Sequence, residues 1–188
     1  MYSRIVLFGH SYVSGLYQFL KNNGSKTNLN LGLENCDIQF IGKGGKSIKS
    51  LNQEDIGSIL SHDPQLLFIM LGDNDLRGDT EEICSMLLQW VSSFQHKLEK
   101  IVFCQTMPRY TTQSHKYHFD EYAEKSNLFN RRLSEKIVQE PNLFMLSFEF
   151  VRSRNAERFF DTKGIHLNGT GFYYYQKEIK NAVIALKN

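Results

Sequence analysis

Short apolar runs alternate along this chain with longer segments in which apolar residues recur every three or four positions. Continuous apolar runs are typical of strands that are buried on both faces, as in a parallel sheet. We predict five such strands, over residues 3–8, 36–41, 65–71, 100–105 and 143–148. The run over 65–71 has the clearest pattern of a buried strand.

The periodic segments are typical of amphipathic helices that bury one face. They predict helices over residues 13–22, about 80–97, about 119–139 and from the capping residue Asn168 to near Lys187, and a weaker helical region over 47–61. The repeated order of strand and helix indicates an α/β fold, in which a parallel five-stranded sheet has helices on both faces. Because no linker, repeat or low-complexity segment interrupts this order, we expect one domain over residues 1–188.

The composition narrows the class of protein without naming a function. Hydrophobic residues make up 41% of the chain and charged residues 22%, as in ordinary globular domains. The net charge of +2 and the lack of a basic run argue against RNA binding by this domain itself. No apolar stretch is long enough to predict a membrane span, and the first predicted strand leaves no room for a signal peptide.

The cysteines also bear on the expected compartment. Cys36, Cys84 and Cys104 are odd in number and widely spaced, so they suggest neither a disulfide framework nor a zinc site. Three free thiols without a signal peptide are typical of a reducing compartment, so we expect an intracellular, cytoplasmic protein. We expect no metal and no other cofactor.

Chemically useful residues follow three of the predicted strands. Ser11 follows the first strand, the loop with Gly44 and Gly45 follows the second, and Asn74 follows the third. The carboxyl ends of parallel strands lie at one edge of a sheet, where α/β proteins bind their ligands. We therefore expect these residues to lie close together, with His166 added from the segment before the last helix.

This set supplies what acyl transfer requires, namely a nucleophile, a base and donors for the developing oxyanion. Ser11 would be the nucleophile and His166 the base, and the oxyanion hole would be formed by the N–H groups of Ser11 and Gly45 with the side-chain amide of Asn74. Simpler interpretations stay open, since Ser11 could merely cap a helix and Asn74 could merely form a turn.

The order of these motifs resembles the SGNH (GDSL-like) hydrolase family. The matching blocks are Gly9-His10-Ser11, Gly45, Gly72-Asp73-Asn74-Asp75 and a C-terminal Gly164-Ile165-His166-Leu167-Asn168, which together span most of the chain. The resemblance implies a flavodoxin-like three-layer sandwich with strand order 2-1-3-4-5. It also implies a serine esterase that acts on small acyl esters, acetyl esters among them, with the Ser11, Gly45 and Asn74 oxyanion hole.

One departure from the family pattern affects the acid of the triad. The family usually places an Asp three residues before the His, and that position is Lys163 here. Asp161 lies five residues before His166, and we name it as the candidate acid. The alternatives are a Ser-His dyad, with Asp161 serving only to bind the amides of its own loop.

A narrower resemblance rests on Gly9-His10-Ser11-Tyr12, Lys43-Gly44-Gly45 and Gly-Ile-His-Leu-Asn. These motifs resemble the esterase domain in the first-open-reading-frame protein of some LINE-type retrotransposons. That resemblance implies an intracellular ribonucleoprotein context, in which regions outside this chain bind RNA.

Further residues around the expected site have structural or lining interpretations. His10 would form a hydrogen bond at the strand end or line the cleft with Tyr12, and Asp75 would tie down its loop or cap the next helix. The aromatic residues Tyr12, Tyr110, Tyr117 and Phe119 could form an apolar wall for the acyl group or contact a lipid. The alternative function is a lipid-, carbohydrate- or protein-binding module on the same fold, with weak or lost catalysis.

Overall fold

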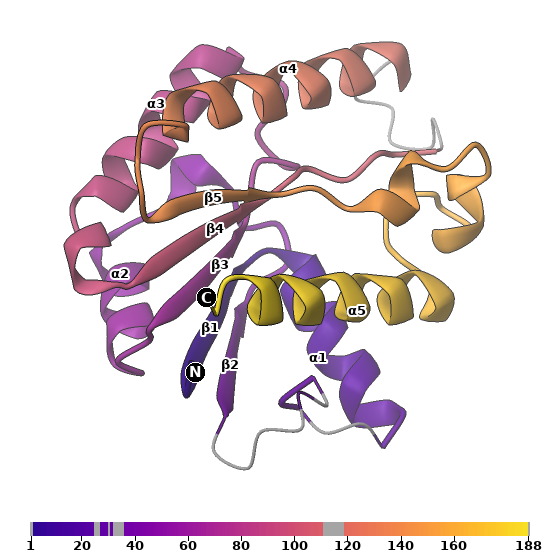
Figure 1. The fold of residues 1–188 in the computed structure, drawn as a ribbon. Coiled ribbons are helices and arrows are strands. Elements are labelled where there is room, and N and C mark those ends of the chain that lie inside the picture. Colours follow the sequence, from indigo (N-terminus) through magenta and orange to yellow (C-terminus); the bar gives the residue numbers. More distant parts are fainter. Residues whose placement is uncertain (1, 25–26, 30, 32–35, 111–118, 188) are drawn as a thin grey trace.

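The computed structural model describes residues 2–24, 27–29, 31, 36–110 and 119–187, with the backbone alone at 119 and 120. Its strands are β1 (Arg4–Gly9), β2 (Asp37–Gly42), β3 (Leu66–Met70), β4 (Lys100–Cys104) and β5 (Leu143–Leu146). They form one parallel sheet in the order β2-β1-β3-β4-β5 (Figure 1). This arrangement confirms the predicted α/β fold and strand order.

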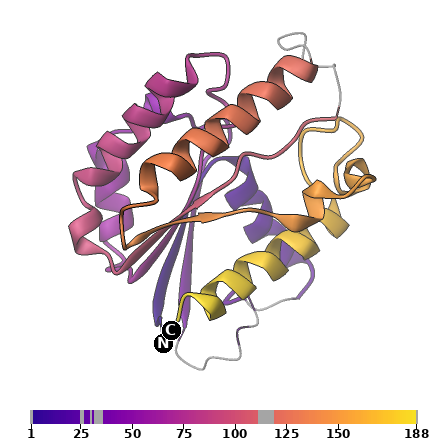
Figure 2. The same ribbon diagram turned by 45° about the horizontal axis from the view of Figure 1, so that its top comes forward.

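Helices cover both faces of the sheet, which gives three layers (Figures 1 and 2). The helices are α1 (Ser11–Asn22), α2 (Gln53–Leu60), α3 (Thr80–Ser92), α4 (Phe119–Ile137) and α5 (Gly169–Ala185). Successive strand residues point to opposite faces. Ile5 and Leu7 of β1 therefore pack in the core with α1 and α5, whereas Val6 and Phe8 pack in the core with α2, α3 and α4.

Two predicted helical regions are shorter than their patterns suggested. The region over 47–61 divides into a 3₁₀ turn (Ile48–Ser50) and α2, because Asn52 starts a new helix. The Asn52 side chain accepts the N–H of Asp55, and the Asp55 side chain accepts the N–H of Asn52, each at 3.1 Å. This reciprocal pair is a capping box.

The helix predicted over 80–97 ends at Ser92, and a separate 3₁₀ turn follows over Gln95–Lys97. Between them Phe94 leaves the helical conformation and places its ring in the core, with 1% of its surface exposed. Burial of this aromatic ring is favourable, and it accompanies the end of the helix. The fifth strand also ends two residues earlier than predicted, at Leu146.

The end of β1 lies very close to β3. A Cβ atom added at Gly9 would lie 2.1 Å from the carbonyl oxygen of Met70, so only glycine allows this approach. The N–H of His10 then donates to the same Met70 oxygen at 3.2 Å. The chain leaves the sheet at this point and enters α1, which places Ser11 at the carboxyl edge of the sheet.

Candidate active site

The Ser11 hydroxyl and the His166 imidazole lie side by side, although 155 positions separate them in the sequence. The distance from Ser11 Oγ to His166 Nε2 is 3.1 Å, which is hydrogen-bond distance. Ser11 is the first residue of α1, and the residue that caps this helix is His10. The interpretation of Ser11 as a helix cap is therefore wrong, and its hydroxyl is available to His166.

Asp161 organises the loop that carries His166. Its Oδ1 accepts the N–H groups of Lys163 at 3.1 Å, Ile165 at 3.2 Å and His166 at 3.4 Å. Its Oδ2 lies 3.9 Å from Nδ1 of His166, which is too long for a direct hydrogen bond. The geometry therefore gives Asp161 the loop-binding contacts of the simpler interpretation and leaves its second oxygen near the imidazole.

A cleft of about 380 Å³ brings the remaining predicted residues together. It is lined by His10, Ser11, Tyr12, Gly44, Gly45, Asp73, Asn74, Arg109, Ile165 and His166. Gly45 has a φ of +72°, in the left-handed region that favours glycine. The side-chain amide of Asn74 donates to the carbonyl of Lys46 at 3.0 Å, which ties the loop after β3 to the loop after β2.

Asp75 makes a second connection between these two loops. Its carboxylate accepts the N–H of Ile48 at 3.0 Å and the N–H of Lys49 at 3.4 Å. Burial raises the pKa of Asp75, and these two hydrogen bonds offset only part of that effect. The alternative role predicted for Asp75 is wrong, because the residue that caps α3 is Asp79.

Tyr12 connects α1 to the loop of His166. Its hydroxyl donates to the carbonyl of Ile165 at 2.6 Å, and its ring centroid lies 6.2 Å from that of His166. Burial, followed by the nearby Asp73 carboxylate, raises the pKa of Tyr12, so the hydroxyl remains a donor. Of the other aromatic residues expected to form a wall, Tyr110 packs on Phe160. Tyr117 and the side chain of Phe119 lie outside the described residues.

Sequence reasoning missed the roles of Asp73 and Arg109. The buried Asp73 carboxylate contacts His10 Nε2 at 2.9 Å through Oδ2, and its Oδ1 accepts the N–H of Met107 at 2.9 Å. Burial alone would raise the pKa of Asp73, but His10, the N–H of Met107 and the Arg109 cation hold it below its usual value.

Arg109 reaches the same cleft from the end of β4. Its guanidinium donates to the Asp73 carbonyl at 2.9 Å and lies 4.6 Å from the ring centroid of Tyr122. Both missed residues follow strands, and this position is the same signal that identified Ser11 and Asn74. The position of Arg109 after a predicted strand could be read from the sequence, but the sequence did not indicate the direction of its side chain.

In the part of the chain that the structure describes, no group of three or more His, Cys, Asp or Glu side chains is arranged to hold a metal ion. Among the helices described, none combines the length and apolar character that crossing a membrane requires.

Comparison with known proteins supports the fold and leaves the family unassigned. No protein-family model and no curated protein sequence matches the chain. A GDSL-like lipase from Bacteroides thetaiotaomicron has a similar structure, with a TM-score of 0.71 and 15% identity over 98% of this chain and 89% of the lipase. A lipase/acylhydrolase from Enterococcus faecalis gives a TM-score of 0.69 and 15% identity, over 96% of this chain and 94% of that one.

The acetyl xylan esterase AlAXEase is similar to the same extent. Its TM-score is 0.67 and its identity 16%, over 96% of this chain and 99% of the esterase. At such low identities the likeness establishes a shared fold.

Proposed function

We propose that this protein is a serine esterase that hydrolyses small acyl esters, acetyl esters among them. The observation that carries the proposal is the 3.1 Å contact between Ser11 Oγ and His166 Nε2. This contact lies in a cleft that Gly45 and Asn74 also line. A hydroxyl beside an imidazole is the arrangement that activates a serine nucleophile.

The proposed reaction proceeds through an acyl-enzyme. His166 Nε2 accepts the Ser11 proton as Ser11 Oγ bonds to the carbonyl carbon of the ester. The N–H groups of Ser11 and Gly45 and the Asn74 amide stabilise the oxyanion that forms. When the tetrahedral intermediate collapses, the bond to the alcohol oxygen breaks and His166 returns the proton to that oxygen. Water then hydrolyses the acyl-enzyme through the same steps.

Asp161 has a supporting role in this proposal. Its three contacts with N–H groups hold the loop, so they fix the position of the His166 ring. Its second carboxylate oxygen, 3.9 Å from Nδ1, adds negative charge beside the imidazolium that forms during the reaction. The carboxylate thus acts as the acid of the triad electrostatically, without a direct hydrogen bond to the imidazole.

The size of the cleft and the related folds support small ester substrates. A cleft of about 380 Å³ is at the lower end of the usual range for small-molecule sites. Proteins with this fold include one named as a GDSL-like lipase and one named as an acetyl xylan esterase. The esterase proposal takes these names as support for ester chemistry and leaves the alcohol part of the substrate open.

The narrower sequence resemblance adds a cellular context to the proposal. The motif Gly9-His10-Ser11-Tyr12 resembles the esterase domain of LINE-type retrotransposon proteins. On this basis the protein would be intracellular and would work beside an RNA-binding region in a ribonucleoprotein. A lipid ester is a further candidate substrate in that context.

A fluorophosphonate probe tests the esterase proposal directly, because it bonds covalently to activated serines. We expect the wild type to be labelled and the Ser11→Ala variant to remain unlabelled. Ser14→Ala is the matched control, since its hydroxyl lies one turn further along α1 and only donates to the Ser11 carbonyl at 3.2 Å. No labelling of folded wild type would favour the binding-module alternative, and labelling of the Ser11→Ala variant would contradict the assignment of Ser11 as nucleophile.

A series of p-nitrophenyl esters with increasing acyl length tests the substrate class. We expect the acetyl ester to give the highest kcat/KM and longer chains to give progressively lower values. A maximum at long acyl chains would overturn the small-acyl part of the proposal while leaving the esterase part intact.

A further inference from the structure

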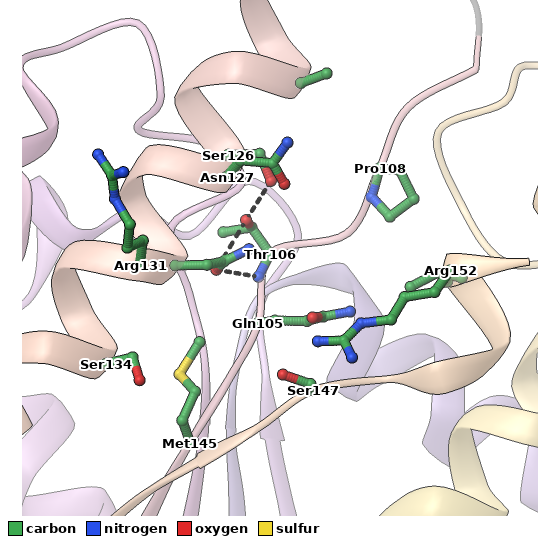
Figure 3. Close-up of a pocket in the computed structure, with 13 residues that line it drawn as sticks. Gln105, Thr106, Pro108, Ser126, Asn127, Arg131, Ser134, Met145, Ser147 and Arg152 are labelled. Carbon is green, nitrogen blue, oxygen red and sulfur yellow. Dashed lines mark hydrogen bonds between the residues drawn. The ribbon is translucent and has the colours of Figure 1, made fainter. Parts of the chain in front are cut away.

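A second pocket, of about 400 Å³, lies between the middle of α4 and the ends of β4 and β5 (Figure 3). Its remaining wall is the 3₁₀ turn Glu149–Arg152. It shares no lining residue with the catalytic cleft. The volume is within the usual range for sites that hold small molecules.

The face of α4 that lines this pocket is polar. Residues on it recur at helical spacing, and they are Ser126, Asn127, Asn130, Arg131 and Ser134, together with Ala123. The adjacent face of the same helix is apolar and packs into the core through Tyr122, Phe129, Leu133 and Ile137. A polar face away from the core is usual for a surface helix, but Ser126 on this face is only 5% exposed, so a buried polar position lies beside the pocket.

The floor of the pocket is a hydrogen-bonded group of polar side chains. Thr106 and Ser126 are 2% and 5% exposed, and their hydroxyl oxygens lie 2.6 Å apart. The Asn130 Oδ1 accepts the N–H of Thr106 at 3.0 Å and also its hydroxyl at 3.2 Å. Because Oδ1 accepts both of these hydrogen bonds, the orientation of the Asn130 side-chain amide is fixed. Among the described residues, no hydrogen bond is formed by its Nδ2.

The rim of the pocket is rich in hydrogen-bond donors. The Arg152 guanidinium points toward Gln105 and Ser147 across the opening (Figure 3). Among the residues that the structure describes, one of its five donors is engaged, since Nη1 donates to Glu149 at 2.8 Å. Arg131 stands on the opposite side with its guanidinium directed away from Thr106 (Figure 3).

The charged side chains that line the pocket are cationic, and each is paired with a glutamate. The two charged side chains of the lining are both arginines, and the lining contains no Asp or Glu. The carboxylates that pair with these arginines, Glu135 and Glu149, lie outside the lining. Guanidinium groups form their strongest hydrogen bonds with carboxylate or phosphate oxygens, and amides and hydroxyls suit hydroxylated ligands.

From these features we infer that this pocket is a second binding site, for a small hydroxylated ligand that bears a carboxylate or a phosphate group. The Arg152 guanidinium would bind the anionic group beside Gln105 and Ser147. The Asn130 and Asn127 amides would donate to hydroxyl oxygens of the ligand. Ligands of this class include sugar acids and phosphorylated polyols.

Nitrogen-15 NMR of the full chain tests this site, because side-chain amides of Asn and Gln give resolved signals. The probes are glycerol 3-phosphate and glucuronate at millimolar concentration, with glycerol as the neutral comparison. We expect the Gln105, Asn127 and Asn130 side-chain signals to shift with at least one anionic probe. The anion that gives the larger shift then identifies phosphate or carboxylate as the preferred group.

Two variants distinguish specific binding in this pocket from nonspecific attraction of the anionic probe to surface arginines. Arg152→Gln is expected to weaken binding about tenfold or more, since it removes the charged partner of the anion. Arg154→Gln, an exposed arginine outside the lining, is the matched control and should bind as the wild type does. Equal shifts with glycerol, undiminished shifts in the Arg152 variant, or no shift with either anion would overturn the inference.

Discussion

The His10 imidazole and the Asp73 carboxylate form a buried pair, with Nε2 of His10 2.9 Å from Oδ2 of Asp73. The side chains are only 2% and 8% exposed. His10 directly precedes Ser11, and Asp73 directly precedes Asn74. The pair therefore connects the backbone of the proposed nucleophile to the backbone of the proposed oxyanion donor.

The hydrogen bonds around this pair fix the direction of each donor. Nδ1 of His10 accepts the N–H of Tyr12 at 3.4 Å, so the ring proton lies on Nε2 and is donated to Asp73. The other oxygen of Asp73 accepts the N–H of Met107 and lies 3.2 Å from the Tyr122 hydroxyl. Asp73 thus receives donors from the ends of β1 and β4 and from α4.

The Asp73→Asn variant should lose about 3 kcal/mol of unfolding free energy, on the scale of lost hydrogen bonds to a buried charged group. Asparagine presents one oxygen and one NH₂ group, whereas both carboxylate oxygens of Asp73 accept hydrogen bonds. The NH₂ group of the asparagine would therefore face either the ring N–H of His10 or the backbone N–H of Met107, and two donors cannot form a hydrogen bond. Urea unfolding at neutral pH measures the loss.

Asp63→Asn is the matched control for this substitution. The Asp63 side chain is 86% exposed and pairs with Arg4 at the surface, so the same change should cost less than about 1 kcal/mol. Equal costs at the two positions would contradict a special role for the buried pair.

Asp73 should also make stability depend on pH in the acidic range. Its folded-state pKa lies below its usual value, so its stabilising contribution is fully present above the unfolded-state pKa of about 4. That contribution is lost as the pH falls from there through the folded-state pKa. Urea unfolding over a series of acidic pH values should show a steeper decline for wild type than for Asp73→Asn. Parallel declines would contradict the assignment.

The fold was predictable because its inner strands, β1, β3 and β4, are largely apolar on both faces. Leu66 to Met70 are all buried, and only a central strand of an α/β sheet needs such a run. The pattern of residues predicted the elements, and the strand order came from the family resemblance. Even the break before α2 had a signal in the sequence, since Asn52 and Asp55 have the spacing of a capping box.

The side-chain geometry of the site was less predictable. Spacing in the sequence could place Asp161 near His166 but could not distinguish a 3.9 Å separation from a hydrogen bond. The pairing of His10 with Asp73 depends on the direction in which each side chain leaves its strand end. Such directions follow from packing across segments that are distant in sequence, and a single sequence does not record them.

Replacement of His166 should affect turnover far more than replacement of Asp161. His166→Ala removes the proposed base, whose contribution is typically 10²- to 10⁴-fold. Asp161→Asn keeps an oxygen for the N–H groups of its loop and removes only a charge 3.9 Å from Nδ1, so we expect about a tenfold loss. Rates of phenyl acetate hydrolysis measure both. Equal losses would show that Asp161 acts as a full member of a triad.

Asn74→Ala should lower kcat by roughly 10²- to 10³-fold, the usual cost of removing one oxyanion donor, with little change in KM. The substitution also removes the contact with the Lys46 carbonyl, so thermal unfolding should accompany the kinetics. Asn181→Ala, on the exposed side of α5, is the control and should keep wild-type rates. A change confined to KM would argue against the oxyanion role.

Two glycine-to-alanine substitutions should change stability in opposite directions. At Gly9 the new methyl group would lie 2.1 Å from the carbonyl oxygen of Met70, so β1 and β3 would have to separate where Ser11 is positioned. We expect this variant to lose about 3 kcal/mol or more, or to fail to fold. Gly57 lies inside α2 with no atom within 4 Å of an added Cβ, so alanine there should add about 1 kcal/mol.

Urea unfolding of both variants beside the wild type measures the two effects, and Gly57→Ala also serves as the control for the substitution itself. Fluorophosphonate labelling adds a second measurement, because a separated strand end would displace Ser11 from His166. We therefore expect Gly57→Ala to be labelled as the wild type is, and any folded Gly9→Ala to be labelled more slowly. A Gly9→Ala variant with wild-type stability and labelling would contradict the close approach of β1 to β3 on which the position of Ser11 depends.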